Sequence, residues 1–298
     1  MRYNKITICK KEKQGEDVLK KIFTITISII LVSLIGLGIT GYYVEKDKAD
    51  NKKEDIKTET QAEQVEEKLV VDINKLDISK LDGYTPGEKL NGEEQSVNTD
   101  ENTVTVGGIS LPYNIEKKNM EILSIGQYSG KFLEDGSDKD KENILAIVVK
   151  NTSDKVIDYG EITMKISGKS GTLKFKVTNL KPGASALVME SSGEVEFNTQ
   201  DRYIYVGSNS NTIKTISLKE DQIAITTKGN KITVENLTDK NINKVYVYYK
   251  TVSPGNCYLG GVTYRLKLQN VRSGKSVSAE SRHFSNLSSE IIKVETVK

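Results

Sequence analysis

The residue of this sequence with the widest range of possible chemistry is its single histidine, His283. It stands in the stretch ESRHFSNLSSE, with Ser281 and Ser285 two positions to either side and a glutamate at each end. A serine hydroxyl, an imidazole and a carboxylate that converge near an oxyanion hole form a nucleophilic catalytic centre. No G-x-S-x-G motif marks a nucleophile, however. We therefore interpret His283 as a residue of a turn or strand end, and keep an enzyme with a site around His283 as the alternative.

A second set of potential ligands lies in the loop that follows Glu134. Its carboxylates alternate with other residues at Asp135, Asp138, Asp140 and Glu142. Calcium takes six to eight oxygen ligands, and alternate carboxylates in a flexible loop supply several of them. The glycine of this loop comes early, unlike the EF-hand order, and two lysines interrupt the acids. The pattern predicts a solvated loop, with calcium binding as the alternative.

The two cysteines, Cys9 and Cys257, fall on opposite sides of a long apolar segment and are not expected to form a disulfide. We predict that Cys257 is a half-buried small hydrophobic residue. A free thiol or an intermolecular disulfide is the alternative. One distant pair of cysteines and a single histidine do not assemble a metal site. We expect no catalytic residue, no metal and no cofactor.

The strand-like stretch VYVYYK carries bulky side chains on both of its faces. Tyr246 and Tyr248 share one face, and Tyr258 is expected nearby. Such tyrosines either pack against a neighbouring sheet or form an exposed aromatic patch. If exposed, Tyr246, Tyr248 and Tyr258 are the candidate surface for a glycan or protein partner.

The elements that must position these residues begin with residues 22–44, IFTITISIILVSLIGLGITGYYV, which hold 23 residues without a charge. That length crosses a bilayer as one helix. Residues 1–21 hold seven Lys/Arg against three acids, which predicts a cytoplasmic tail and an extracytoplasmic remainder. A cleaved signal peptide is the alternative, but no A-x-A-like site follows. Residues 45–103 are dense in charge and almost devoid of aromatics, which predicts a disordered extracytoplasmic spacer.

The overall charge argues against one class of partner. The net charge is +2, with 28% charged residues of both signs and only five arginines. Nucleic-acid-binding proteins usually carry a clear basic patch. We therefore expect no nucleic acid as a partner.

From residue 104 onward, short runs that alternate apolar and polar residues recur between clusters of Gly, Asn, Asp and Ser. The runs are rich in Val, Ile, Thr and Tyr, and this spacing is typical of an all-β sandwich. The pattern also repeats: VKNTSDKVID begins at Val149, and VENLTDKNIN begins 85 residues later at Val234. The stretches LKFKVTNLKPGAS and YRLKLQNVRSGKS match at an offset of 91, and the extra six residues fit the loop TVSPGNCYLGG. We predict two tandem antiparallel β-sandwiches, at 104–218 and 219–298.

The repeat decides how three glycosylation sequons are interpreted. They begin at Asn151, Asn236 and Asn286. Asn side chains satisfy backbone groups in turns, and Gly183 and Gly274 of the second motif can adopt a positive φ. We therefore predict that these asparagines serve the turns between strands rather than carry a glycan.

The pattern [IV]-x-V-x-N-x-[ST]-D-K followed by N-L-x-P-G-x-S resembles the small immunoglobulin-like sandwiches of extracytoplasmic Gram-positive proteins, the FxLYD-like class. The stretches YSGKFLEDGSDKDKENILAIVVKNTSDK and YLGGVTYRLKLQNVRSGKSVSAESRHFS are similar to uncharacterised single-pass membrane proteins of such bacteria. The resemblance covers about two-thirds of the chain, but ITMKI and VYVYY stand where F-x-L-Y-D is expected. It implies a fold and a location and carries no catalytic residues across.

Together these features predict a non-catalytic, membrane-anchored extracytoplasmic protein of the bacterial cell envelope. Its expected role is to bind or scaffold a protein or polysaccharide of the envelope. A cell-envelope enzyme with a site around His283 is one alternative. A membrane sensor or adaptor that acts through its short cytoplasmic tail is the other.

Overall fold

The structure, a computed structural model, describes residues 69–90, 103–115 and 119–298. These residues fold almost entirely as β-strands, as the alternating sequence pattern predicts. No helix among them is long and apolar enough to cross a membrane. The predicted span 22–44, the tail 1–21 and Cys9 lie outside the described residues.

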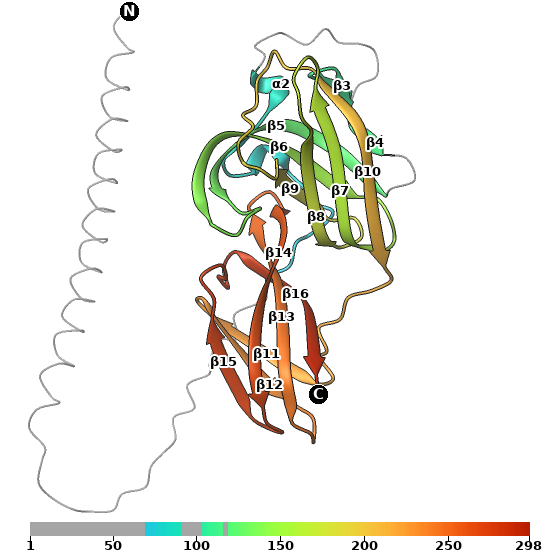
Figure 1. Ribbon diagram of the computed structural model, residues 1–298. Helices are drawn as coiled ribbons and strands as arrows, with labels where there is room; N and C mark the ends of the chain where they lie inside the picture. The colour runs from blue at the N-terminus through green and yellow to red at the C-terminus, as the bar shows by residue number, and fades with distance from the viewer. Residues whose placement is uncertain (1–68, 91–102, 116–118) are drawn as a thin grey trace, which may run out of the picture. The chain divides into compact units, whose positions relative to one another are not determined.

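The strands fall into an N-terminal group and two sets of six (Figure 1). The N-terminal group consists of η1 (Ile78–Lys80), β1 (Tyr84–Pro86), α2 (Gly87–Leu90), β2 (Val104–Val106), β3 (Ile109–Leu111) and β4 (Tyr113–Ile115). The first set consists of β5 (Met120–Phe132), β6 (Lys139–Asn151), β7 (Val156–Ile166), β8 (Leu173–Leu180), β9 (Ser185–Met189) and β10 (Tyr203–Ile213). The second set consists of β11 (Ile223–Lys228), β12 (Lys231–Asn236), β13 (Ile242–Ser253), β14 (Cys257–Val271), β15 (Ser276–Glu280) and β16 (Ser289–Val297).

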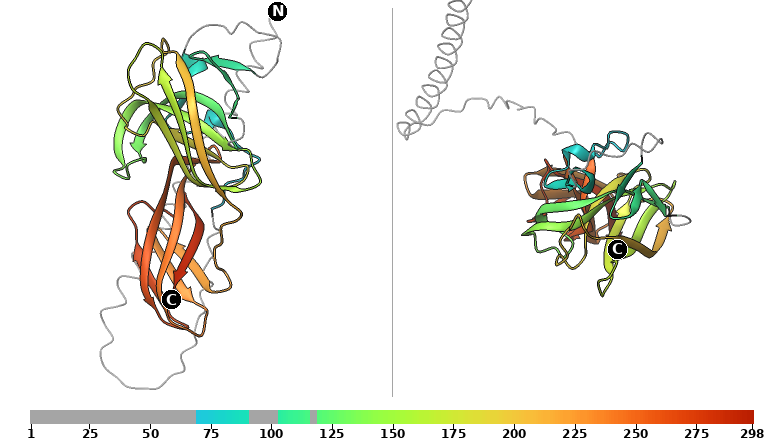
Figure 2. Two further views of the ribbon diagram at one scale, coloured as in Figure 1. Left: turned by 45° about the vertical axis from the view of Figure 1, so that its right-hand side comes forward. Right: turned by 90° about the horizontal axis from the view of Figure 1, so that it is seen from above.

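The two sets of six have the same topology. In the first, β5-β6-β9 forms one layer and β10-β7-β8 the other; in the second, β11-β12-β15 and β16-β13-β14 form the two layers. The register agrees as well, because Ile122 pairs with Val149 and Ile225 pairs with Val234. These valines open the two copies of the sequence motif. The internal repeat therefore corresponds to two equivalent six-stranded sandwiches, and both pairs of layers can be followed in Figures 1 and 2.

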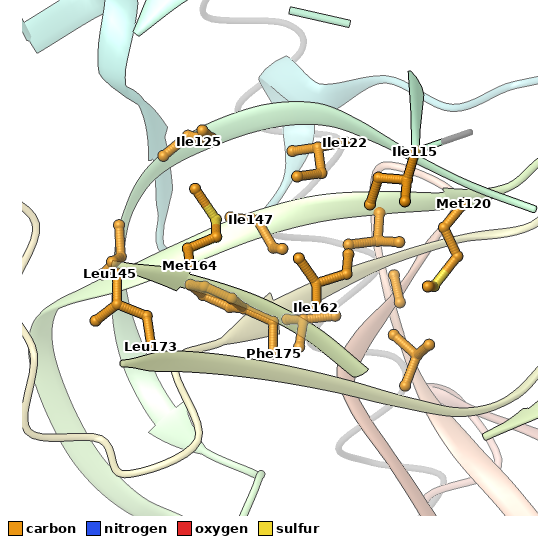
Figure 3. Packing of buried hydrophobic residues seen from close by; sticks show 14 of the residues in the cluster. Ile115, Met120, Ile122, Ile125, Leu145, Ile147, Ile162, Met164, Leu173 and Phe175 are labelled. Atoms are coloured by element: carbon orange, nitrogen blue, oxygen red, sulfur yellow. The ribbon is translucent and has the colours of Figure 1, made fainter. Parts of the chain in front are cut away.

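The core of the first sandwich lies between its two sheets (Figure 3). Phe175 of β8 is 1% exposed and lies opposite apolar side chains of the facing sheet. Ile122, Ile125, Leu145 and Ile147 come from the facing sheet, and Ile162 and Met164 come from β7, beside Phe175. They stand at alternate positions of their strands, except that a register shift in β5 separates Ile122 from Ile125 by three. Burial of each such side chain contributes roughly 1.5–3 kcal/mol. This apolar face is what the period-2 pattern of the sequence predicts.

Residues 69–90 correct the predicted boundaries of the spacer. Tyr84 of β1 pairs with Tyr128 of β5, and its hydroxyl donates to Ser124 Oγ at 2.8 Å. Leu81 and Tyr84 are buried in a second cluster on the outer face of the β5-β6-β9 sheet. The prediction of a disordered spacer that extends to residue 103 is therefore wrong for 69–90. The apolar residues of this segment alternate with many charged and polar ones, and Leu81 and Tyr84 become buried because a sheet surface is there to receive them.

The sequence pattern predicts a loop at TVSPGNCYLGG, and the structure shows that this prediction is wrong. Strands β13 and β14 continue through it to a tight turn, with Ser253 paired to Cys257. The extended hairpin then pairs with the first sandwich, because Tyr258 of β14 lies opposite Ala186 of β9. This pairing is parallel, and it merges the two antiparallel halves into one eight-stranded sheet. The six inserted residues therefore lengthen the hairpin that joins the two sandwiches.

The duplicated asparagines confirm the predicted turn chemistry. Asn151 is fully buried, and its Nδ2 donates to the carbonyls of Lys155 and Leu180 at 2.7 and 2.9 Å. Its Oδ1 accepts bonds from the backbone N–H and the hydroxyl of Ser153. Because both hydrogens of the amide are donated inside the protein, the side chain is occupied by the turn rather than presented for glycosylation.

The second copy reproduces the same bonds. Asn236 Nδ2 donates to the carbonyls of Lys240 and Val271 at 2.8 and 3.0 Å, and its Oδ1 accepts from Thr238. Gly183 and Gly274 have φ of 72° and 62°, the left-handed values that the following turns require. The third sequon, at Asn286, lies in the turn before β16.

Candidate binding site

His283 is held by bonds to both ring nitrogens. Its Nδ1 lies 2.6 Å from Asp138 Oδ2, and Arg282 Nε donates to its Nε2 at 2.9 Å. Since Nε2 accepts, the proton of the neutral imidazole is on Nδ1 and points at the carboxylate. The ring also stacks on Tyr264, with centroids 4.4 Å apart and planes 12° apart. The imidazole is thus saturated by its neighbours.

The structure brings the two predicted chemical sites together, because Asp138 belongs to the acidic loop. Tyr264 donates to Asp138 Oδ1 at 3.1 Å, and Arg282 Nη2 donates to the carbonyl of Gly136 at 3.0 Å. Ser281 Oγ is bonded instead to the hydroxyl of Tyr249, at 2.6 Å. No serine hydroxyl is therefore aligned on His283 by these contacts. The cluster fastens the β5–β6 loop to the segment between β15 and β16.

The acidic loop does not gather its carboxylates. Asp138 is engaged by His283 and Tyr264, whereas Asp135 Oδ1 accepts from the backbone N–H of Ser137 at 2.8 Å. Within residues 69–90, 103–115 and 119–298, no group of three or more His, Cys, Asp or Glu side chains is placed to hold a metal ion. Asp138 of this loop is thus committed to the contact with His283 and Tyr264.

Cys257 packs as a small hydrophobic residue and is fully buried, deeper than the half-buried position predicted from the sequence. Burial raises the pKa of its thiol to about 12, which leaves it protonated and unreactive at neutral pH. It belongs to the apolar cluster on the outer face of the β5-β6-β9 sheet. This residue therefore supplies packing and no redox chemistry.

The three candidate tyrosines differ in their exposure to solvent in the structure. Tyr258 is 0% exposed and donates to Glu290 Oε2 at 2.7 Å, so its assignment to an exposed patch is wrong. Tyr246 and Tyr248 are half-buried on one face of β13. Arg265 lies over the ring of Tyr246 at 4.9 Å, and Lys293 over that of Tyr248 at 5.1 Å. These two tyrosines form a surface partly covered by cations, and it stays a candidate for partner binding.

The tip of the same strand carries a polar group that the sequence does not reveal. Lys250 follows Tyr246 and Tyr248 at alternate positions, which suggests a solvent-facing side chain, yet it is fully buried. Its Nζ donates to the carbonyls of Thr178, Gly261 and Val262 at 3.1, 3.0 and 2.8 Å. These acceptors come from β8 and β14, so the ammonium group joins the two sandwiches.

Glu134 lies on the other side of this junction. It is half-buried, and its Oε1 accepts from the backbone N–H groups of Gly261 and Met189 at 3.0 and 3.1 Å. Desolvation raises the pKa of Glu134 to about 7, although these donors and Lys250 act in the opposite direction. Desolvation likewise lowers the pKa of Lys250 to about 7. Both groups therefore titrate near neutrality in the folded protein.

A pH dependence of stability follows for Glu134. The folded protein binds a proton on Glu134 that the unfolded chain releases between about pH 4.5 and pH 7. The resulting stabilisation is complete below the unfolded-state pKa and is lost as the pH rises through about 7. We expect urea unfolding to show this loss in the wild type but not in Glu134→Gln. The expectation is contradicted if the stability difference between the two proteins does not change between about pH 4.5 and pH 6, below the pKa of about 7 that Lys250 shares with Glu134.

An apolar pocket of about 530 Å³ lies between β11 and β16. Each is the last strand of its sheet, and the chain that enters β11 closes part of the gap. The apolar walls come largely from Ile216, Leu218, Ile223, Ile225, Ile291 and Ile292. Of the residues singled out from the sequence, only Asn286, the first residue of the third sequon, lines it.

One end of this pocket is polar. Glu290 is 4% exposed at its side chain and forms an ion pair with Lys181, and both residues line the pocket. Glu290 Oε2 also accepts from Tyr258 and from the backbone N–H of Val71 at 3.3 Å. The pocket thus combines an apolar interior with a fixed charged pair, the usual composition of a small binding site. The alternation in IAIT of β11 and SEIIKV of β16 predicts strands. It does not show that the outer edges of these strands lack a neighbouring strand.

Comparison with protein-family models finds no match to the chain. A search of curated proteins finds no significant match either. The fold and the pocket define an all-β protein of two equivalent sandwiches, the second of which is open along one side.

Proposed function

We propose that this chain is a non-catalytic binding or scaffolding protein, anchored in the membrane by residues 22–44, whose immunoglobulin-like sandwiches stand outside the cytoplasm in the bacterial cell envelope. The observation that carries the binding role is the apolar pocket between β11 and β16. Its volume lies within the range of about 300–1,000 Å³ that is common for ligand sites. The anchor and the location are supported by the uncharged segment, the charge bias before it and the resemblance to FxLYD-like envelope proteins.

The rival enzyme finds less support. Both nitrogens of His283 are engaged, by Asp138 and Arg282, and Ser281 is bonded to Tyr249. A general base needs a free acceptor within reach of the proton that it removes. A role in binding requires no such group and uses the pocket as it stands. The partly covered face of Tyr246 and Tyr248 offers a second, shallower surface for an envelope protein or polysaccharide.

The binding role is tested by photo-crosslinking in native membranes. A photoreactive amino acid replaces Ile225 in the full-length chain, and a matched variant carries it at Thr226, which is exposed on the opposite face of β11. We expect an envelope component to be captured from position 225 and not from 226, because alternate side chains of a strand point to opposite faces. Equal capture at the two positions, or none at either, would count against the pocket as the binding site.

A further inference from the structure

The internal repeat indicates what belongs in the pocket. In the first sandwich, Met120 and Ile122 of β5 pair with Asn151 and Val149 on one side and with β4 on the other. In the second sandwich, Ile223 and Ile225 of β11 pair with the duplicated Asn236 and Val234. Ile223 and Ile225 therefore occupy the positions of Met120 and Ile122. β4 marks the place where a further strand can pair with the edge of β11.

The opposite wall of the pocket, formed by β16, has the same equivalence between the two sandwiches. Tyr205 of β10 pairs with Met164, and Ile291 of β16 pairs with Tyr249, which is the repeat equivalent of Met164. Both edge strands then slip by one residue, at Val206 and at Ile292. Because even this bulge is duplicated, Ile291 holds the position of Tyr205. The two walls of the pocket thus correspond, residue by residue, to two strands that face a filled gap in the first sandwich.

An extended segment fills that gap in the first sandwich. Tyr113 of β4 pairs with Ile122 and lies against Tyr205, with ring centroids 5.4 Å apart. Ile115 is buried beside Met120, as Figure 3 shows. The residues before β4 contribute further core side chains, at Val106, Ile109 and Leu111. Residues 104–115 therefore supply apolar side chains to this core from the edges of both sheets.

In the part of the chain that the structure describes, the N-terminal segment reaches the corresponding pocket only with Leu69 and Val70, which form no strand. No strand there pairs with the outer edge of β11. The linker before β11 takes another path, in which the carbonyl of Ser217 accepts from Val294 N–H of β16 at 2.8 Å. Ile216 and Leu218 of this linker close one end, and the pocket remains beside Ile225 and Ile291. These are the equivalents of the two residues that Tyr113 contacts.

We propose that the pocket receives an extended segment of a partner protein, which adds to the edge of β11 as β4 adds to β5. This inference rests on the proposed binding function and names its ligand class. An exposed strand edge presents N–H and C=O groups that another strand satisfies and a lipid chain does not. The paired stretch of β11, Ile223–Thr227 in sequence, carries no charge that would repel an apolar strand. The ligand therefore has apolar or aromatic side chains at alternate positions, as Tyr113 and Ile115 are in β4.

The test uses a synthetic peptide of residues 103–115, TVTVGGISLPYNI, and the full-length chain in lipid nanodiscs. We expect saturable binding by fluorescence anisotropy and slower amide exchange in β11. Ile225→Lys places a charge in the pocket and should weaken binding about tenfold or more. Thr226→Lys, on the opposite face, should leave it unchanged. A peptide with the same composition but without the alternation should not bind.

The remaining outcomes are also decisive. Ile225→Lys must show the circular dichroism spectrum of the wild type. If it does not, Ile225→Cys is used instead, and its thiol is blocked by a bulky reagent after folding. The wild type treated with the same reagent is the control. The proposal is overturned if neither Ile225 variant loses peptide binding. So does occupation by a labelled fatty acid, or by a second copy of the chain, that the peptide does not displace. Capture at position 225 without peptide binding refutes the strand ligand alone, whereas absence of both also refutes the proposed function.

Discussion

Asn236→Ala is expected to lower the free energy of unfolding by about 3 kcal/mol. The side chain is fully buried and makes four hydrogen bonds, two as donor to the carbonyls of Lys240 and Val271 and two as acceptor from Thr238. Each buried polar group that loses its partner costs roughly 1–3 kcal/mol, and water reaches part of this turn to compensate. The change is measured by urea unfolding followed by circular dichroism.

Two further substitutions serve as controls for this prediction. Asn243→Ala removes an exposed asparagine from β13 and should change stability by less than about 0.5 kcal/mol. Asn236→Asp keeps the shape but turns a carboxylate oxygen toward two carbonyls, so it should destabilise at least as much as alanine at neutral pH. The interpretation fails if Asn236→Ala unfolds at the same urea concentration as Asn243→Ala.

The equivalent asparagine of the first sandwich allows the same substitution to be tested a second time in the same protein. Asn151 makes the corresponding bonds in the first sandwich, so Asn151→Ala should cost a similar free energy. The two sites share no hydrogen-bond partner, and distant substitutions usually add. The double variant is therefore expected to lose close to the sum of the single losses, about 6 kcal/mol.

Lys250→Met is expected to destabilise the protein by about 3 kcal/mol or more, and to loosen the junction between the sandwiches. The substitution leaves the carbonyls of Thr178, Gly261 and Val262 without their common donor. Faster amide exchange should accompany the loss, and it should concentrate in β8 and β14, which supply these acceptors. Hydrogen exchange with mass spectrometry and urea unfolding measure the two effects.

Lys244→Met is the matched control, because Lys244 lies on the same strand and is exposed. A double variant with Glu134→Gln tests the electrostatic partner. Since the charge of Glu134 favours the protonated form of Lys250, the two substitutions should be less than additive. A Lys250→Met protein as stable as Lys244→Met would show that the buried ammonium group does not hold the junction.

Local chemistry explains what was predictable from the sequence. The turns at Asn151 and Asn236 bind their own residues two and four positions ahead, so the motif contains most of its own partners. Alternation of apolar residues sets which face of each strand is buried, and the repeat therefore predicted two equivalent sandwiches.

Other features depend on which surfaces meet. Tyr258 and Lys250 belong to an alternating strand pattern that is compatible with solvent, and they are buried where the two sandwiches meet, at the pairing of β14 with β9 and at Thr178 of β8. Residues 69–90 mix apolar side chains with many charged ones, a pattern that did not predict order, and a sheet face beneath them supplies the contacts that order them. His283 and Asp138 are distant in sequence and meet only through the fold.

The sequence by itself determined the all-β class, the duplication and the hydrogen-bonded turns, because each is written in residues a few positions apart. The tertiary structure alone decided that one sandwich is filled along its open side by residues 104–115, while the other keeps a pocket between β11 and β16. Both edges carry the same alternating pattern. Whether an edge is paired depends on the path of a segment elsewhere in the chain, and that path is set by long-range packing rather than by local periodicity.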